Sequence, residues 1–287
     1  FQMAYFLFAG VGFYAISRIF QTRSDQSEAN GTYFTSRRVK LTMSFILAAV
    51  LGLTLSAVQF FPASSYVMEH SRRTSTTVNA TPIEARSYSS SWSLHPEELI
   101  GLAIPEFVGV SNANEPWSQN TYWGRNGFKG NHEYMGIIVL ILCGISLFTR
   151  RKVHMKNYLV GMGLVSLLFA LGENTPFWGI LYESLPGINL FRAPSLAIFL
   201  TGFSVITLMA IGLEEVWTLA TTKQDTLRWR RIWIFVTSVG CFLSLGLFSS
   251  YTGSLASFWT DFVYPDISLP SKQILDNSND FITKGFL

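Results

Sequence analysis

The sequence predicts an all-α membrane protein, a polytopic bundle of transmembrane helices with interfacial amphipathic helices and an ordered outer loop. Of the 287 residues, 49% are hydrophobic and only 14% are charged, whereas a soluble domain carries about 25% charged residues. Long apolar stretches alternate with short polar ones, as expected for a single transmembrane domain over 1–287. Six spans are predicted, at about 1–20, 41–62, 134–149, 157–172, 195–217 and 232–250.

The distribution of basic residues predicts the orientation of these spans. Thirteen of the 21 Lys and Arg residues fall in the three short connections after the first, third and fifth spans. By the positive-inside rule these connections are cytoplasmic, which places 63–133, 173–194 and 251–287 on the outer side of the membrane. We therefore expect a multi-pass protein with three outer segments, the last of them amphipathic.

Several classes of protein are excluded by composition. Cys143 and Cys241 lie inside apolar runs, which leaves no disulfide framework and no cysteine zinc site in the loops. The basic residues form short clusters between spans, so a nucleic-acid partner is not expected. No Walker loop, GxGxxG turn, HExxH helix or GxSxG elbow is present. Because the chain begins inside an apolar run at Phe1, without an initiator Met, we expect a fragment of a longer protein.

The stretch 173–194 predicts a short interfacial helix followed by a cation. Thr175 can cap a helix over 175–185 whose first residue is Pro176, and Pro186-Gly187 ends it. About ten residues are too few to cross a membrane, so we expect this helix to lie on the surface. Arg192 then sits at headgroup level, just before the fifth span. The predicted apolar face consists of Phe177, Ile180, Leu181 and Leu185.

The outer loop 63–133 predicts a second helix, which opens with His95-Pro96 and ends at Pro105. Glu97 and Glu98 in its first turn suit the helix dipole, and we interpret them as structural. Glu106 follows the end of this helix at Pro105, so the helix dipole does not explain it. The run NTYWGRNGFKGNHEYMG then interleaves aromatic rings with charged groups. Rings suit sugar faces and cations suit phosphate, although aromatic residues at an interface also serve as plain anchors. The candidates in this run are Tyr122, Trp123, Arg125, Lys129, His132 and Glu133.

Several of these stretches resemble the YfhO family of bacterial multi-spanning membrane proteins, within the GT-C glycosyltransferases. The resemblance covers most of residues 1–217. It rests on FQMAYFL, AVQFFPA, PEFVG, YWGRNGF followed by HEYMG, and above all GENTPFWGILYESLPGINLFRAPS. It implies an enzyme of the bacterial inner membrane that moves a sugar from a polyprenyl-phosphate carrier to a cell-envelope acceptor on the outer leaflet. The catalytic carboxylate typical of GT-C enzymes would precede Phe1, so it cannot be assigned here.

The chemistry of such a transfer selects candidates among the residues present. A cation must stabilise the departing phosphate, and a carboxylate must orient or deprotonate the acceptor. We assign the phosphate to Arg192, with Arg125 and Lys129 as weaker candidates. The other assignments are Glu106 and Glu133 as carboxylates, Tyr122 and Trp123 as sugar-stacking rings, and His132 as a further substrate-binding residue.

Structural alternatives remain open for these residues. Arg192 can anchor the chain to phosphates of ordinary membrane lipids, and Glu133 can pair with Arg125 or Lys129. The sequence offers no spacing that demands a cofactor, and a divalent metal remains open because some GT-C enzymes use one. The competing function is a non-catalytic subunit that scaffolds a larger complex, with a membrane-protein partner covering the aromatic residues. A transporter fits less well, since the spans contain few ionisable groups.

Overall fold

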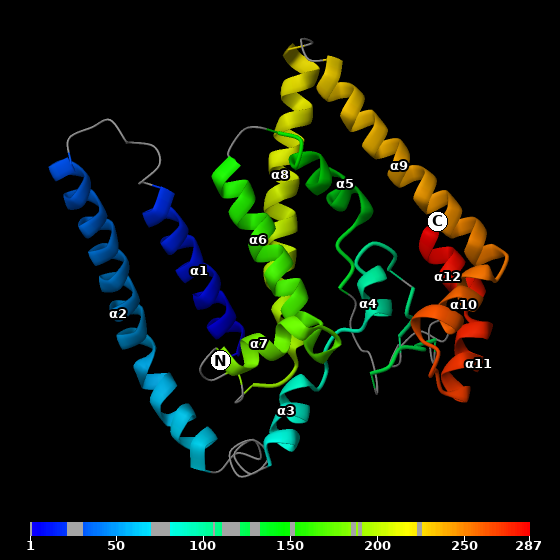
Figure 1. Ribbon diagram of the computed structural model, residues 1–287, viewed down its shortest axis with the longest axis horizontal. Coiled ribbons are helices and arrows are strands. Elements are labelled where there is room, and N and C mark those ends of the chain that lie inside the picture. The colour runs from blue at the N-terminus through cyan, green and yellow to red at the C-terminus, as the bar shows by residue number, and fades with distance from the viewer. Residues whose placement is uncertain are drawn as a thin grey trace.

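The computed structural model describes residues 2–21, 31–69, 81–105, 107–110, 121–126, 133–149, 153–184, 188, 191–222 and 226–287. All regular structure within these ranges is helical, which confirms the predicted all-α class. The helices alternate in direction along the chain and form an open bundle with smaller helices at one end (Figure 1).

Four long helices contain segments that are apolar enough to cross a membrane. These segments are Thr42–Gln59 within α2 (Gly31–Glu69), all of α6 (Val153–Ala170), Pro194–Thr222 including α8 (Ile198–Thr222), and all of α9 (Thr226–Tyr251). The predicted first span forms α1 (Gln2–Gln21). The predicted third span forms only a ten-residue helix, α5 (Ile137–Ser146). At 1.5 Å per residue this helix is about 15 Å long, half the hydrocarbon thickness.

Helix α8 is the centre of the bundle, where it packs against α5 and α6. Gly212 of α8 allows the closest approach, because a Cβ atom there would lie 1.9 Å from the carbonyl oxygen of Leu142 in α5. In contrast, α2 packs against α1 and stands at the edge of the bundle (Figure 1). Its described side chains are mostly exposed and apolar, as expected of a helix surrounded by hydrocarbon.

The small helices gather at one end of the bundle, opposite the α8–α9 connection (Figure 1). They come from the three segments that the charge pattern placed together, 63–133, 173–194 and 251–287. These helices are α3 (Pro82–Ser90), α4 (Pro96–Ile100), α7 (Pro176–Ser184), α10 (Ser254–Phe258), α11 (Leu269–Asn277) and α12 (Asn279–Phe286).

An aromatic cluster joins the outer loop to the C-terminal segment. The rings of Phe107, Trp123 and Trp259 meet edge to face, with centroids 5.7, 5.1 and 6.0 Å apart in the three pairs. The indole Nε1 of Trp123 donates to the carbonyl oxygen of Phe107 at 2.9 Å. Leu275 of α11 and Ile282 of α12 complete this buried core. The C-terminal segment is thus packed onto the outer loop rather than free on the surface.

Helix α7 forms where the interfacial helix was predicted, with two differences. Thr175 does not cap it, because its hydroxyl instead donates to the carbonyl oxygens of Leu168 and Gly172 at 3.2 and 3.3 Å. Phe177 and Leu181 pack inward as predicted, whereas Ile180 is exposed. The buried residue of the helix is Trp178, whose ring stacks on Tyr182 at 4.9 Å. Leu185 lies outside the described residues.

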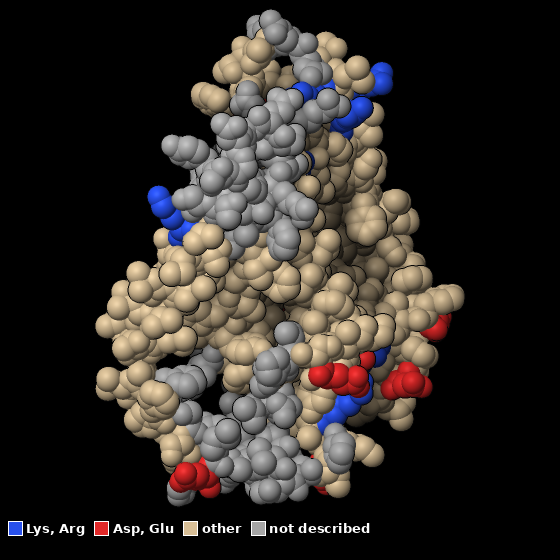
Figure 2. All heavy atoms as spheres, turned by 60° about the vertical axis from the view of Figure 1, so that its left-hand side comes forward, with Lys and Arg blue, Asp and Glu red and all other residues tan. Residues whose placement is uncertain are grey.

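Charge is unevenly distributed along the bundle. On the face shown in Figure 2, blue Lys and Arg side chains lie toward the α8–α9 end. Most red Asp and Glu side chains on this face lie at the end of the small helices, where blue side chains also occur. Arg228, Arg230 and Arg231 begin α9, while Asp261, Asp276 and Asp280 belong to the C-terminal segment. The two ends of the bundle therefore differ in electrostatic character.

Candidate functional site

Two carboxylates in the first turn of α4 form the centre of the candidate site. The helix begins at Pro96, and the backbone N–H of His95 donates to Glu98 Oε2 at 2.9 Å. This contact satisfies the N–H of the residue before the helix and fixes the Glu98 side chain. Glu97 follows Pro96 directly and is 0% exposed. A helix of five residues thus holds two buried acidic groups at the end of the bundle where the small helices gather.

Besides the His95 N–H, two side chains donate hydrogen bonds to the Glu98 carboxylate. Tyr122 Oη donates to its Oε1 at 3.2 Å, and Asn126 Nδ2 lies 3.2 and 3.1 Å from its two oxygens. The Asn126 amide also donates to the carbonyl oxygen of Ser93 at 3.1 Å, which ties the segment before α4 to the site. Burial, followed by the Glu98 charge, raises the pKa of Tyr122. The phenol therefore stays protonated and remains a donor to the carboxylate.

Glu97 faces the cation of the site. Its Oε1 lies 3.4 Å from Nε of Arg125, and neither oxygen makes a hydrogen bond of ordinary geometry with a described residue. Burial raises the pKa of Glu97. The neighbouring backbone N–H groups and the Arg125 charge lower the pKa of Glu97, whereas the Glu98 charge raises it further. A buried carboxyl group with a raised pKa, as Glu97 has, is suited to take up and release a proton.

Arg125 is positioned by the C-terminal segment. Its Nη2 donates to the carbonyl oxygen of Val263 at 2.8 Å, and its guanidinium lies 4.1 Å from the centre of the Tyr264 ring. The Arg125 side chain is 29% exposed, so it connects the buried Glu97 with the protein surface. A guanidinium has five N–H donors, which leaves some of them for an anion.

This arrangement can combine proton transfer with anion binding. A carboxyl group of raised pKa and a fixed guanidinium lie side by side, which is the pairing that acid-base chemistry on a phosphorylated substrate requires. Within the described ranges, no group of three or more His, Cys, Asp or Glu residues is placed to hold a metal ion.

The structure brings together two of the predicted site residues and places others elsewhere. Arg125 and Tyr122 belong to the acidic cluster, by which we mean Glu97 and Glu98 with the residues that contact them or Arg125: Tyr122, Arg125, Asn126 and Tyr264. Trp123 is fully buried, and its ring packs in the aromatic core together with Tyr122, so the sugar-stacking role of these two rings stays a prediction. Glu133 lines a different groove, of about 380 Å³, together with Gly202 and Ile206 of α8. Three further predicted residues, Glu106, Lys129 and His132, lie outside the described residues.

Arg192 belongs to a second cluster. Its side chain is exposed, and its guanidinium lies 5.7 Å from the centre of the Tyr88 ring of α3. The carbonyl oxygens of Arg192 and Ala193 accept from Nε2 of Gln2 in α1, at 2.5 and 3.2 Å. Ala193 has a φ of +58°, a left-handed conformation that is uncommon for a residue with a side chain. This turn fixes Arg192 between α1 and the start of α8.

Sequence reasoning missed four residues of the acidic cluster: Glu97, Glu98, Asn126 and Tyr264. Glu97 was interpreted as a helix-dipole residue, because an acidic residue in a first turn is usually solvated. The available signal was its position between Leu94 and Leu99, which are apolar residues that pack in the same buried cluster. Tyr264 carries no local signal, since its link to Arg125 spans 139 residues of chain.

The fold and the apolar helices place the chain in the class of helical membrane proteins. Comparison with protein-family models, with curated proteins and with solved structures found no match for it.

Proposed function

We propose that this chain is part of a membrane glycosyltransferase that moves a sugar from a polyprenyl-phosphate carrier to a cell-envelope acceptor. The observation that supports the proposal is the Glu97–Arg125 pair, at the end of apolar helices where the small helices gather. A substrate with a lipid tail and a phosphate would reach such a site from the membrane, and its phosphate would need a cation there.

The proposal assigns the chemistry to neighbouring groups. The acceptor hydroxyl oxygen attacks the anomeric carbon, the bond from that carbon to the phosphate oxygen breaks, and the hydroxyl proton passes to the ionised form of Glu97. The leaving phosphate carries the negative charge that Arg125 stabilises. Arg125 replaces Arg192 as the proposed phosphate ligand, because Arg125 lies beside the carboxylate. The raised pKa of Glu97 makes it a better proton acceptor than an exposed glutamate.

The proposed location is the bacterial inner membrane, with the site on the outer side. The basic residues near the α8–α9 connection favour a cytoplasmic position for that end of the bundle. The acidic cluster would then face the outer leaflet, where a polyprenyl-phosphate donor of envelope synthesis presents its sugar.

The test is Glu97→Gln in the full-length protein. We expect transfer from a panel of polyprenyl-phosphate sugars to acceptors in isolated membranes to fall by about 10²-fold or more, the usual contribution of a general base. Glu173→Gln is the matched control, because Glu173 is a 45% exposed carboxylate paired with Arg86 at the same end of the bundle. Full transfer by a Glu97→Gln variant that is present at normal levels would refute the proposed role.

A scaffold without catalysis is the second candidate, and one observation favours it. The described apolar side chains of α2 and α9 are largely exposed, including Leu55 and Val58 of α2 and Phe242 of α9. Such surfaces fit either lipid or a partner helix. Under this reading, Glu97→Gln would leave transfer unchanged, whereas polar substitutions at Leu55 would release a co-purifying membrane protein.

A further inference from the structure

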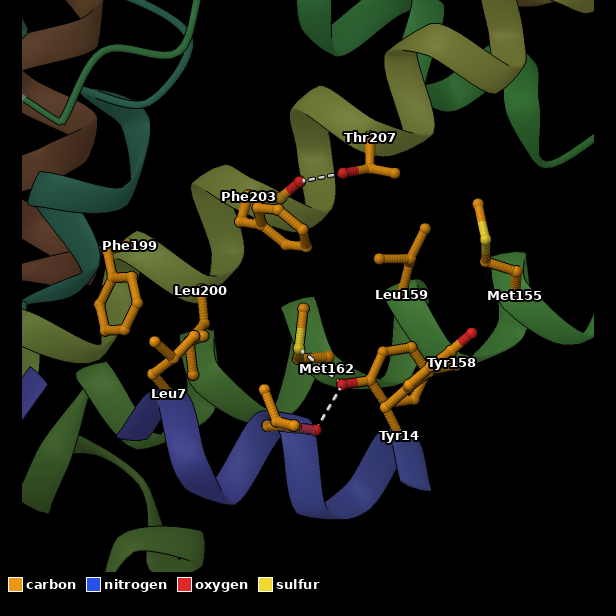
Figure 3. Close-up of a pocket in the computed structure, with 12 residues that line it drawn as sticks. Leu7, Tyr14, Met155, Tyr158, Leu159, Met162, Phe199, Leu200, Phe203 and Thr207 are labelled. Atoms are coloured by element: carbon orange, nitrogen blue, oxygen red, sulfur yellow. Dashed lines mark hydrogen bonds between the residues drawn. The ribbon is translucent and has the colours of Figure 1, made fainter. Parts of the chain in front are cut away.

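A groove runs between α1, α6 and α8, away from the acidic cluster (Figure 3). Its volume is about 340 Å³, within the range of roughly 300–1,000 Å³ that is usual for ligand sites. Leu7 and Tyr14 of α1 border one side, and Leu159 and Phe203 border the others. Its α1 lining residues run from Leu7 to Tyr14, which is about two turns of the helix.

The walls of the groove favour a hydrocarbon ligand. The Tyr158 hydroxyl donates to the carbonyl oxygen of Gly10 at 2.6 Å, and the Thr207 hydroxyl donates to that of Phe203 at 2.8 Å. These two hydroxyls are engaged within the protein, and most of the remaining lining residues are aliphatic, aromatic or Met. A ligand here would gain contact with apolar surface and few directed hydrogen bonds.

The position of the groove indicates where its ligand comes from. Two of its three helices, α6 and α8, contain candidate membrane spans, so the groove lies at the depth of the hydrocarbon core. Its rim residues Leu7 and Phe203 are 51% and 59% exposed. The groove is therefore open toward the surroundings of the bundle, as a site filled sideways from the bilayer would be.

A cation lies beyond the end of the groove nearest the small helices. A separate hollow of only about 10 Å³ lies on the same elements and is lined by Gln2 and Phe6 of α1, Phe169 of α6, and Arg192 with Pro194 before α8. The rings of Phe6 and Phe169 meet edge to face at 5.2 Å and separate the two spaces. Leu7, the next residue after Phe6, already lines the groove. The exposed Arg192 thus lines a hollow whose α1 residue Phe6 directly precedes the groove residue Leu7.

We infer that the groove holds one acyl chain of an anionic bilayer phospholipid, whose headgroup phosphate pairs with Arg192. An apolar groove at membrane depth with a cation near its end matches both parts of such a lipid. None of the residues that line the groove or the hollow belongs to the cluster of Glu97, Glu98 and Arg125. The inference is therefore independent of the proposed transfer reaction and assigns Arg192 to a separate lipid.

The groove is tested by two matched glycine substitutions in α1. A Cβ atom on Gly10 would lie 3.3 Å from Sδ of Met162 and 3.7 Å from Cδ2 of Leu200, whereas one on Gly12 meets nothing within 4 Å. Gly10→Leu therefore narrows the groove, and Gly12→Leu is its control. After purification with phosphatidylglycerol and phosphatidylcholine of equal chain length, native mass spectrometry measures the lipids retained. We expect Gly10→Leu to reduce the retention of both lipids and Gly12→Leu to leave the retention of both unchanged.

The headgroup is tested by Arg192→Gln, with Arg231→Gln on α9 as its control. Loss of one Arg near an anionic headgroup corresponds to about a fivefold change in retention. We expect Arg192→Gln to remove a preference of that size for phosphatidylglycerol while phosphatidylcholine is retained as before. Leu7→Ser, at the exposed rim, gives a second groove variant with little risk to folding. It should reduce both lipids.

Three outcomes would overturn the inference. Equal lipid retention by the Gly10→Leu and Gly12→Leu proteins would exclude the groove. An unchanged headgroup preference in the Arg192→Gln protein would exclude Arg192 as the ligand of the headgroup phosphate. Displacement of phosphatidylglycerol by an equimolar polyprenyl phosphate would assign the groove to the lipid carrier instead. None of these measurements depends on sugar transfer, so their failure is distinct from failure of the proposed function.

Discussion

Removing the cation of the acidic cluster tests whether the site depends on it. Arg125→Ala deletes the hydrogen bond to the Val263 carbonyl oxygen, the stacking on Tyr264 and the attraction to Glu97. A charged hydrogen bond contributes about 1.5–3 kcal/mol, and a partly exposed cation–π contact adds about 0.5–1 kcal/mol. Breaking a fully buried pair costs about 3–5 kcal/mol, but the Arg125 side chain is 29% exposed. We therefore expect a loss of about 2–4 kcal/mol.

That loss corresponds to a decrease in Tm of roughly 5–15 °C for a chain of this size. Thermal unfolding in detergent, followed by tryptophan fluorescence, can measure it because Trp123 and Trp259 lie in the adjoining core. The double variant Arg125→Ala/Glu97→Gln should regain part of the loss, since the neutral amide leaves no buried charge without a partner. If the Tm of the double variant equals the wild-type Tm plus the sum of the two single changes, whatever their signs, the proposed pairing is wrong.

An exposed ion pair at the same end of the bundle provides the control. Arg86 Nε lies 3.1 Å from Glu173 Oε1, a shorter distance than in the acidic cluster, but the two side chains are 47% and 45% exposed. Solvent screening limits such a pair to about 0–1 kcal/mol. Arg86→Ala should therefore change Tm much less than Arg125→Ala. A decrease of similar size in both variants would mean that burial does not distinguish the two sites.

Two further predictions concern the protonation of Glu97 and the packing of α8. Burial raises the pKa of Glu97, so its stabilising contribution is complete below its ordinary value of 4.5 and is lost as pH rises through the raised pKa. Glu97→Gln should thus raise Tm relative to the wild type at neutral pH. Thermal unfolding measured over a range of pH should show this difference in Tm disappearing below pH 4.5. Gly212→Ala should lower Tm, because its Cβ would collide with the Leu142 carbonyl oxygen, whereas Gly161→Ala, with nothing within 4 Å, should add about 0.5–1 kcal/mol.

The helical spans could be predicted from sequence because their signal is local. Apolar runs of about twenty residues leave few alternatives to a helix, and α6, α8 and α9 begin and end within about six residues of the predicted bounds. The exception is the third span, which shortens to α5. It begins after Gly136, whose φ of +89° interrupts the helix, and ends after Ser146. Hydropathy alone does not detect a backbone break of this kind.

The candidate site could be predicted only in part because its contacts are between distant parts of the chain. The sequence drew attention to Arg125 and Tyr122, since charged and aromatic residues alternate around them. Tyr122 and Trp123 are both buried in the same core, and nothing local predicts that the Tyr122 hydroxyl bonds Glu98 while the Trp123 indole bonds the Phe107 carbonyl oxygen. Likewise, nothing local predicts that Tyr264 covers Arg125.

The aromatic core explains how distant segments come to share one site. Trp123 is adjacent to Tyr122 and two residues from Arg125, so burying its ring against Trp259 fixes both neighbours relative to the C-terminal segment. The same packing brings Val263 and Tyr264 to the guanidinium. Because burial of a large aromatic side chain contributes a few kcal/mol, this core can compensate for the cost of enclosing two carboxylates. Trp123 is thus a positioning residue, and its contribution to any chemistry at Glu97 passes through Arg125.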